Sequence, residues 1–150
     1  MKTKFTLFSA LFFLMMSISF AQKNEESQSI IGGNVNIAKY HSRENLEEMP
    51  KGDLLVLYIE RIEVIVNILP NIAFATKPGV TMESLGIPET KENNKALEEN
   101  IEASGDYFES TIEFQKKILP YSDTTDLIAA ILFYESTLKA LHTYEDFKKN

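Results

Sequence analysis

The side chains of this chain that could do chemistry are mostly carboxylates. Glu60 and Glu63 stand one helical turn apart in a strongly apolar segment, and Glu135 and His142 stand two turns apart near the end of the chain. Carboxylate and imidazole groups bind metal ions when they project from neighbouring helices into a common interior. These four residues are the candidate ligand or metal site. The alternative is that Glu60 and Glu63 form the solvent-facing edge of a buried helix, because charged side chains are rarely buried unless they are paired.

Motifs of known enzymes and cofactor sites give no support for catalysis. The chain has no cysteine, which excludes thiolate metal sites, iron–sulfur clusters, cysteine nucleophiles and disulfides. It contains neither a G-x-S-x-G motif nor the Glu-x-x-His pairs of di-metal helical proteins. Gly32-Gly33 is not part of a phosphate-binding loop. We therefore expect no enzymatic activity and no cofactor.

The first 21 residues have the pattern of a cleaved secretory signal. Lys2 and Lys4 precede the apolar residues 7–16, and Ser19 and Ala21 are the small residues that a signal peptidase reads. The apolar run is shorter than the roughly 20 residues that a membrane span needs. We expect residues 1–21 to be removed, and the mature protein to be exported to the periplasm or the cell exterior without a membrane anchor.

The charge of the chain restricts its partners. Removing Lys2 and Lys4 lowers the number of basic residues from 15 to 13 against 22 acidic ones, which makes the net charge −9. An acidic surface repels the phosphate backbone, so nucleic acid is not an expected partner. If there is a partner, we expect another envelope or secreted protein.

The remaining chain divides into a leader, residues 22–41, and a helical domain, residues 42–150. The leader is flexible or extended: residues 29–40 could form a strand pair around Gly32-Gly33, or an extended segment lying against the domain. Residues 42–49 are expected to form a short helix capped by Ser42 and stopped by Pro50.

Three longer helices are expected in the domain. Residues 54–69 form one, capped by Asp53, although their β-branched residues would also suit a buried strand. Residues 88–119 form the longest, about 48 Å at 1.5 Å per residue. Residues 123–147 form the last, with Asp123 as its cap. Residues 46–70 and 97–120 share several short sequence matches in the same order. These matches reflect either a duplicated helical hairpin or coincidence.

The longest segment carries one stripe of core-type residues at helical spacing. The stripe continues in phase through Gly105, so we predict a single helix with Ser104-Gly105 as the place for any bend. Its members are Leu97, Ile101, Ser104, Phe108, Ile112 (or Thr111), Gln115 and Leu119.

These elements predict an all-α fold, an antiparallel bundle of three to four helices. On the last helix Ile128, Leu132 and Phe133 widen the apolar face, so they either pack between two neighbours or form an exposed interaction surface. The leading hypothesis is an exported, non-enzymatic module that binds another protein through the Ile128/Leu132 side or the projecting end of the long helix. The alternative is a carrier that holds a small apolar ligand or a metal in the bundle core.

Overall fold

The computed structural model describes residues 27–32, 35 and 37–144, and these are mostly helical. The α-helices among them are α2 (Arg43–Glu47), α3 (Lys51–Ile68), α4 (Lys91–Ile118) and α5 (Thr124–Ala140). Short 3-10 turns follow or separate them: η1 (Leu69–Asn71), η2 (Glu83–Leu85), η3 (Leu119–Tyr121) and η4 (Leu141–Thr143). These residues contain no strand, only an isolated bridge between Ser29 and Thr81. The all-α prediction is confirmed, and the predicted signal peptide lies outside the described residues.

Several helix boundaries differ from the sequence prediction. α3 begins at Lys51 and not after Asp53, because Pro50 has a φ of −56° that suits a helix start and needs no N–H partner there. Asp53 lies in the first turn and is not the cap. α4 begins after its cap Thr90, and α5 ends at Ala140 and not at residue 147. The Ser42 cap of α2 is confirmed, since its hydroxyl accepts from the backbone N–H of Asn45.

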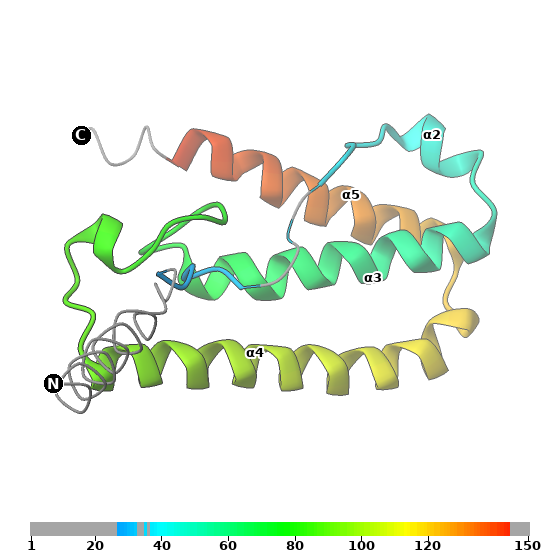
Figure 1. Ribbon diagram of the computed structural model, residues 1–150. Coiled ribbons are helices and arrows are strands. Elements are labelled where there is room, and N and C mark those ends of the chain that lie inside the picture. Colours follow the sequence, from blue (N-terminus) through cyan, green and yellow to red (C-terminus); the bar gives the residue numbers. More distant parts are fainter. Residues whose placement is uncertain (1–26, 33–34, 36, 145–150) are drawn as a thin grey trace, which may run out of the picture.

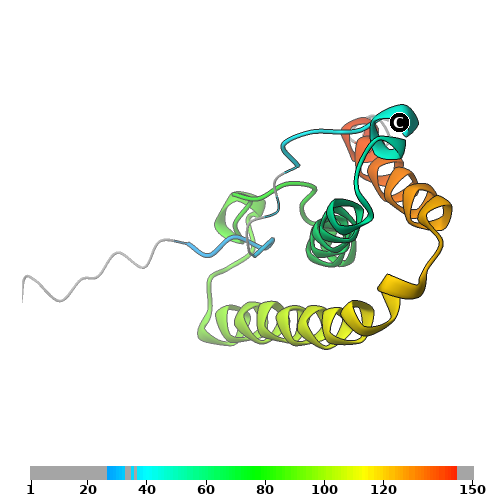
Figure 2. The same cartoon turned by 90° about the vertical axis from the view of Figure 1, so that its right-hand side faces the viewer.

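α3 lies between α4 and α5 and makes the main contacts with both (Figure 1). α4 runs antiparallel to α3, and α5 runs parallel to α3. The strongest packing, between α3 and α5, therefore joins two parallel helices. In Figure 2, α3 is seen end-on, and α4 and α5 lie apart on either side of it. The described helices thus form an open arrangement around α3.

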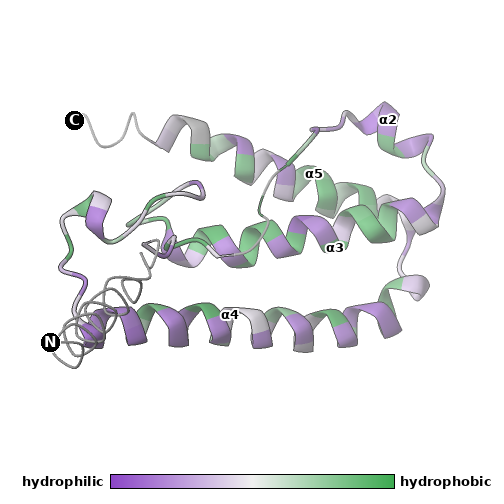
Figure 3. Cartoon of the chain, viewed as in Figure 1, coloured by the Kyte–Doolittle hydropathy of each residue, from purple (hydrophilic) through white to green (hydrophobic). Residues whose placement is uncertain are grey.

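Two apolar clusters form the core, and most of their helical members come from α3 and α5. One cluster lies at the start of these helices, and its buried residues are Leu46, Leu54, Leu57, Ile128 and Ile131. The other lies towards their ends, and its buried residues are Ile30, Ile31, Val35, Val64, Ile68, Ala75 and Leu138. Figure 3 agrees with this location of the core, since hydrophobic residues are frequent on α3 and α5 and hydrophilic ones dominate on α4.

The leader takes the extended alternative where it is described. Ile30, Ile31 and Val35 are buried in the second cluster, and the Ile30 N–H donates to the carbonyl oxygen of Val80 at 2.8 Å. A Cβ at Gly32 would lie 3.0 Å from Cγ2 of Ile101 on α4, so glycine permits the close approach of these segments. The packed part of the chain therefore begins before residue 42.

α4 is one uninterrupted helix of 28 residues, as predicted, and it passes through Gly105. The predicted stripe is the side that packs towards the rest of the protein. Each of its positions is buried or half-buried, from Leu97 to Leu119. Ile112 is nevertheless the only fully buried residue of α4. Most of this helix is therefore exposed.

Candidate functional site

A polar cluster of three side chains lies in the core between α3 and α5. Glu135 of α5 and Arg61 of α3 are 1% and 4% exposed. Oε1 of Glu135 accepts hydrogen bonds from Arg61 Nε at 3.0 Å, from Arg61 Nη2 at 2.9 Å and from His41 Nδ1 at 2.9 Å. Oε2 accepts the backbone N–H of His41 at 2.6 Å. Both oxygens of this buried carboxylate are therefore occupied by donors.

The cluster ties the leader to the helices. Nη2 of Arg61 also donates to the carbonyl oxygen of Lys39 at 2.9 Å, so residues 39–41 are held from both sides. Although burial opposes ionisation of Glu135, the hydrogen bonds from His41 and the Arg61 guanidinium hold the pKa of this carboxyl below its usual value. A carboxylate acceptor selects the His41 tautomer that carries its proton on Nδ1. The cluster is thus a fully satisfied ion pair with a histidine donor.

Sequence reasoning missed this cluster because it did not weigh Arg61. The signal was present: Arg61 is a cation on the apolar side of a strongly hydrophobic helix, one turn after Leu57. Such a residue requires a buried acidic partner. Glu135 was singled out, but as a metal ligand beside Glu60 and Glu63.

The predicted ligand set is not brought together as a unit. Glu60 is exposed and Glu63 half-buried, and both line a polar pocket of about 500 Å³ with His41 and Lys39. Glu135 lies instead in the core with its oxygens occupied, so its assignment to a ligand site with Glu60 was wrong. The side chain of His142 lies outside the described part. Within that part, no three acidic or histidine side chains converge to hold a metal ion.

The polar pocket has limited chemical capability. His41 has its Nδ1 on Glu135, while its Nε2 makes no hydrogen bond with the residues described. This nitrogen could exchange a proton with a bound molecule. The residues that line the pocket include no serine, threonine or cysteine, so the imidazole has no hydroxyl or thiol nucleophile beside it there. The arrangement serves to join the leader, α3 and α5.

One motif spacing was overlooked in the sequence. Ser136 and Lys139 have the S-x-x-K spacing of some acyl-transfer enzymes. Both are exposed on α5, and Nζ of Lys139 lies 4.8 Å from the centroid of the Tyr40 ring. This position is a cation–π contact. The geometry thus gives Lys139 a packing partner, the ring of Tyr40.

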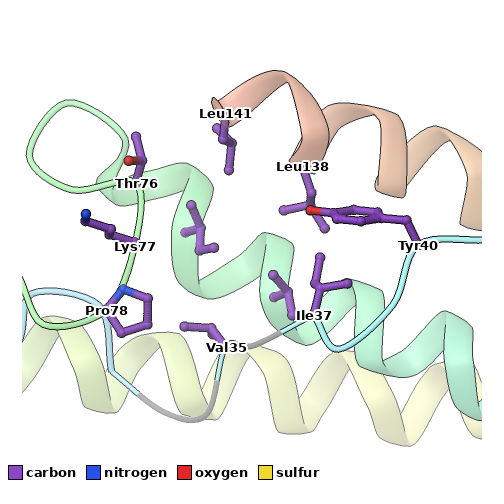
Figure 4. A pocket seen from close by; sticks show the side chains of 10 residues that line it. Val35, Ile37, Tyr40, Thr76, Lys77, Pro78, Leu138 and Leu141 are labelled. Carbon is purple, nitrogen blue, oxygen red and sulfur yellow. The ribbon is translucent and has the colours of Figure 1, made fainter. Parts of the chain in front are cut away.

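An apolar cavity of about 570 Å³ lies beside the second core cluster. Its walls come from the leader, α3 and the end of α5: Val35, Ile37, Val64, Ile68, Leu138 and Leu141. Tyr40, Thr76 and Lys77 add polar groups to the lining. Figure 4 shows the hydroxyl end of Tyr40 directed towards Leu138. The volume is in the range of small-molecule sites.

The interaction surface expected on the last helix is largely inside the protein. Ile128 is 3% exposed and belongs to the first core cluster, and Leu132 packs against the same cluster. The prediction of an Ile128/Leu132 surface was wrong because α2 and α3 cover that side of α5. Of the three residues, only Phe133 is exposed, at 68%.

The long helix carries a second stripe, on the flank beside the packed one. Its residues are uncharged and all are exposed: Ala96, Asn100, Ala103, Tyr107, Ser110, Phe114 and Ile118. Successive members are three or four residues apart, the spacing with which one helix packs along another. All charged residues of α4 lie outside this stripe, which we call the exposed α4 stripe.

A groove of about 600 Å³ adjoins the first half of the exposed α4 stripe. It runs between the end of α3 and α4. Its lining consists of Ile65, Val66, Leu69, Pro70, Asn100, Ala103, Ser104 and Tyr107. The groove exists because Asn100 and Ala103 are small, and the side chains of α3 do not fill the space above them.

Comparisons with protein-family models, with curated proteins and with solved structures give no match for this chain. Among the residues that the structure describes, no helix has the length and apolar character needed to cross a membrane.

Proposed function

We propose that this protein is an exported, non-enzymatic interaction module that binds a helix of another protein along the exposed α4 stripe. The observation that carries the proposal is the stripe itself. Tyr107, Phe114 and Ile118 are large, apolar and exposed on one flank of a helix that is otherwise rich in charge. Exposed apolar patches of this kind mark interaction sites.

The groove supports a helical partner in particular. A helix laid along the stripe would place its own apolar residues between α3 and α4, which is the helix-in-groove mode of recognition. It would also cover the side of α3 that α5 leaves open. The partner would then complete a helical bundle of the kind predicted from the sequence, which was expected to have three to four helices. We place the partner among envelope or secreted proteins, in keeping with the expected signal peptide.

The test is capture of a partner from envelope extract with tagged mature protein and two matched variants. Phe114→Glu places a charge in the stripe, whereas Phe133→Glu places the same charge on an equally exposed aromatic of α5. Aromatic residues at the centre of interfaces contribute about 2 kcal/mol or more, so Phe114→Glu should weaken capture roughly 30-fold. Phe133→Glu should capture the partner as the wild type does. Equal capture by both variants would refute the proposal, provided that circular dichroism shows both to be folded.

The apolar cavity favours a second candidate, a carrier of a small apolar molecule. The aliphatic walls would bind the apolar body of a ligand, and the Tyr40 hydroxyl, which makes no hydrogen bond with the described residues, could orient a polar group. Native mass spectrometry of protein from its own host should then show additional bound mass. Ile37→Trp, which narrows the cavity, should remove it. A clean apo mass from the wild type would count against the carrier.

A further inference from the structure

We propose that the occupant of the exposed α4 stripe is a second copy of this chain, with the two α4 helices packed antiparallel about a two-fold axis near Tyr107. This inference rests on the proposed function, because it assigns the partner of the same surface. It follows from three properties of the stripe: the sizes of its residues, the position of the groove, and the flanking charges.

The sizes of the residues change from one end of the stripe to the other. The first half has the small residues Ala96 and Ala103, whereas the second half has the bulky Phe114 and Ile118. With Tyr107 on the axis, an antiparallel second copy places Ile118 opposite Ala96 and Phe114 opposite Asn100. Each large side chain then meets a small one, and this alternation fills the interface evenly. A parallel pair would set large against large and leave small facing small.

The groove and the exposed phenylalanine form a matching pair on one chain. The groove lies over Asn100 and Ala103 and has Val66 and Leu69 as apolar walls. Phe114 is 61% exposed and lies two helical turns beyond Tyr107. The two-fold axis brings Phe114 of each copy to the groove of the other. Such an interface is self-complementary and closed, which is the commonest geometry of soluble dimers.

The flanking charges favour the antiparallel direction. Glu99 and Lys117 lie on the same outer edge of the stripe at 100° per residue, at nearly equal distances from Tyr107. In an antiparallel pair, residues on the same edge face each other, so Glu99 of one copy meets Lys117 of the other. This attractive pair forms twice, whereas the like charges of the two Asp106 residues meet once, next to the axis. Among the described residues, Lys117 has no ion pair, and Glu99 has only an exposed contact with Lys95 at 3.4 Å. A parallel pair would bring the lysines of both copies to one end.

The dimer would also complete the core. α3 packs on the side of α4 next to the stripe, so the two-fold axis sets α3 and α4 of both copies side by side. Four helices then enclose the two grooves. The uncharged stripe is where two mature chains, each of net charge −9, can approach with few charged side chains between them.

Sedimentation equilibrium of the mature protein at micromolar concentration tests the proposal. The wild type should be a dimer, Phe114→Glu should raise the dissociation constant at least about tenfold, and Phe133→Glu should leave it unchanged. A wild type that is monomeric throughout would overturn the dimer. If Phe114→Glu then still loses capture of a different protein, the proposed function stands without the dimer. A dimer that Phe114→Glu does not weaken would overturn the assigned surface.

Disulfide crosslinking tests the relative direction of the two α4 helices. Because the chain has no native cysteine, every crosslink must form between the introduced cysteines. Tyr107→Cys should crosslink to itself, because the axis passes near it. Ala96→Cys mixed with Ile118→Cys should give a mixed dimer, while Ile118→Cys alone should not crosslink. Self-crosslinking of Ile118→Cys in place of the mixed pair would refute the antiparallel arrangement.

Discussion

Replacing Glu135 by glutamine perturbs the centre of the packing between α3 and α5. The substitution keeps the shape of the side chain but removes its charge and converts one acceptor oxygen into a donor amide. Arg61, which is 4% exposed, then has no buried counter-charge. The amide group also opposes one of the donors that now reach the carboxylate, either from Arg61 or from His41.

The magnitude follows from burial. Removing one partner of a buried ion pair costs about 3–5 kcal/mol, because the other charge stays desolvated and uncompensated. A domain of this size has a free energy of unfolding of about 5–15 kcal/mol, so the loss is a large fraction of the total. It corresponds to a fall in Tm of roughly 10–20 °C.

The assay is urea unfolding followed by far-ultraviolet circular dichroism. With m of about 1–3 kcal/mol per molar urea, the midpoint for Glu135→Gln should fall by about 2 M with m unchanged. Glu60→Gln is the matched control, since Glu60 is exposed and its carboxylate lies 3.8 Å from Arg61 Nη1; it should cost less than about 1 kcal/mol. A double change, Arg61→Leu with Glu135→Leu, should recover part of the lost stability, because no unpaired charge stays buried; the groups of His41 and Lys39 that the pair now satisfies keep the recovery incomplete. If Glu135→Gln unfolds within about 0.5 kcal/mol of the wild type, the cluster does not stabilise the fold as argued.

Two further predictions concern the acid dependence of stability and two glycine positions. Because the pKa of Glu135 is lower in the folded chain, the unfolded chain takes up this proton at a higher pH. The ionised Glu135 therefore stabilises the fold above about pH 4.3, and this stabilisation is lost as the pH falls below that value. Glu135→Gln should flatten the dependence of the unfolding free energy on pH in this acid range, and an unchanged slope would contradict this. Gly32→Ala should destabilise the fold by about 1 kcal/mol or more, because the added methyl group would contact Ile101. Gly105→Ala should stabilise the fold by about 0.5–1 kcal/mol, because no atom lies within 4 Å of the added methyl group and alanine favours a helix. In thermal melts the Tm of the two variants should therefore move in opposite directions.

The elements predicted well from sequence are those whose signal is local. The stripe from Leu97 to Leu119 predicted both the continuity of α4 and its packed side, because helical periodicity records which flank is buried. The Ser42 cap followed from side-chain chemistry within four residues.

The errors concern partners distant in sequence. The widened apolar face around Ile128 allowed either burial or an interaction surface, and Ile128 is buried because α2 and α3, whose positions are set by the whole fold, cover it. Glu135 was named as a possible metal ligand, whereas its actual partners, Arg61 and His41, are 74 and 94 residues away in the chain. The residues of the exposed α4 stripe have a heptad-like spacing that is visible in the sequence. This spacing would equally suit a second buried face of the helix, and only the open arrangement of the helices shows that the stripe is exposed.

The amino-acid sequence by itself determined which segments are helical, which flank of each helix is apolar and that no covalent crosslink supports the core. Only the tertiary structure decided that α5 packs parallel to α3, that a carboxylate and a guanidinium meet between the two apolar clusters, and that one apolar flank of α4 stays uncovered. The physical reason is that periodicity reports burial along one helix. The identity of the covering surface depends on contacts between residues far apart in the chain.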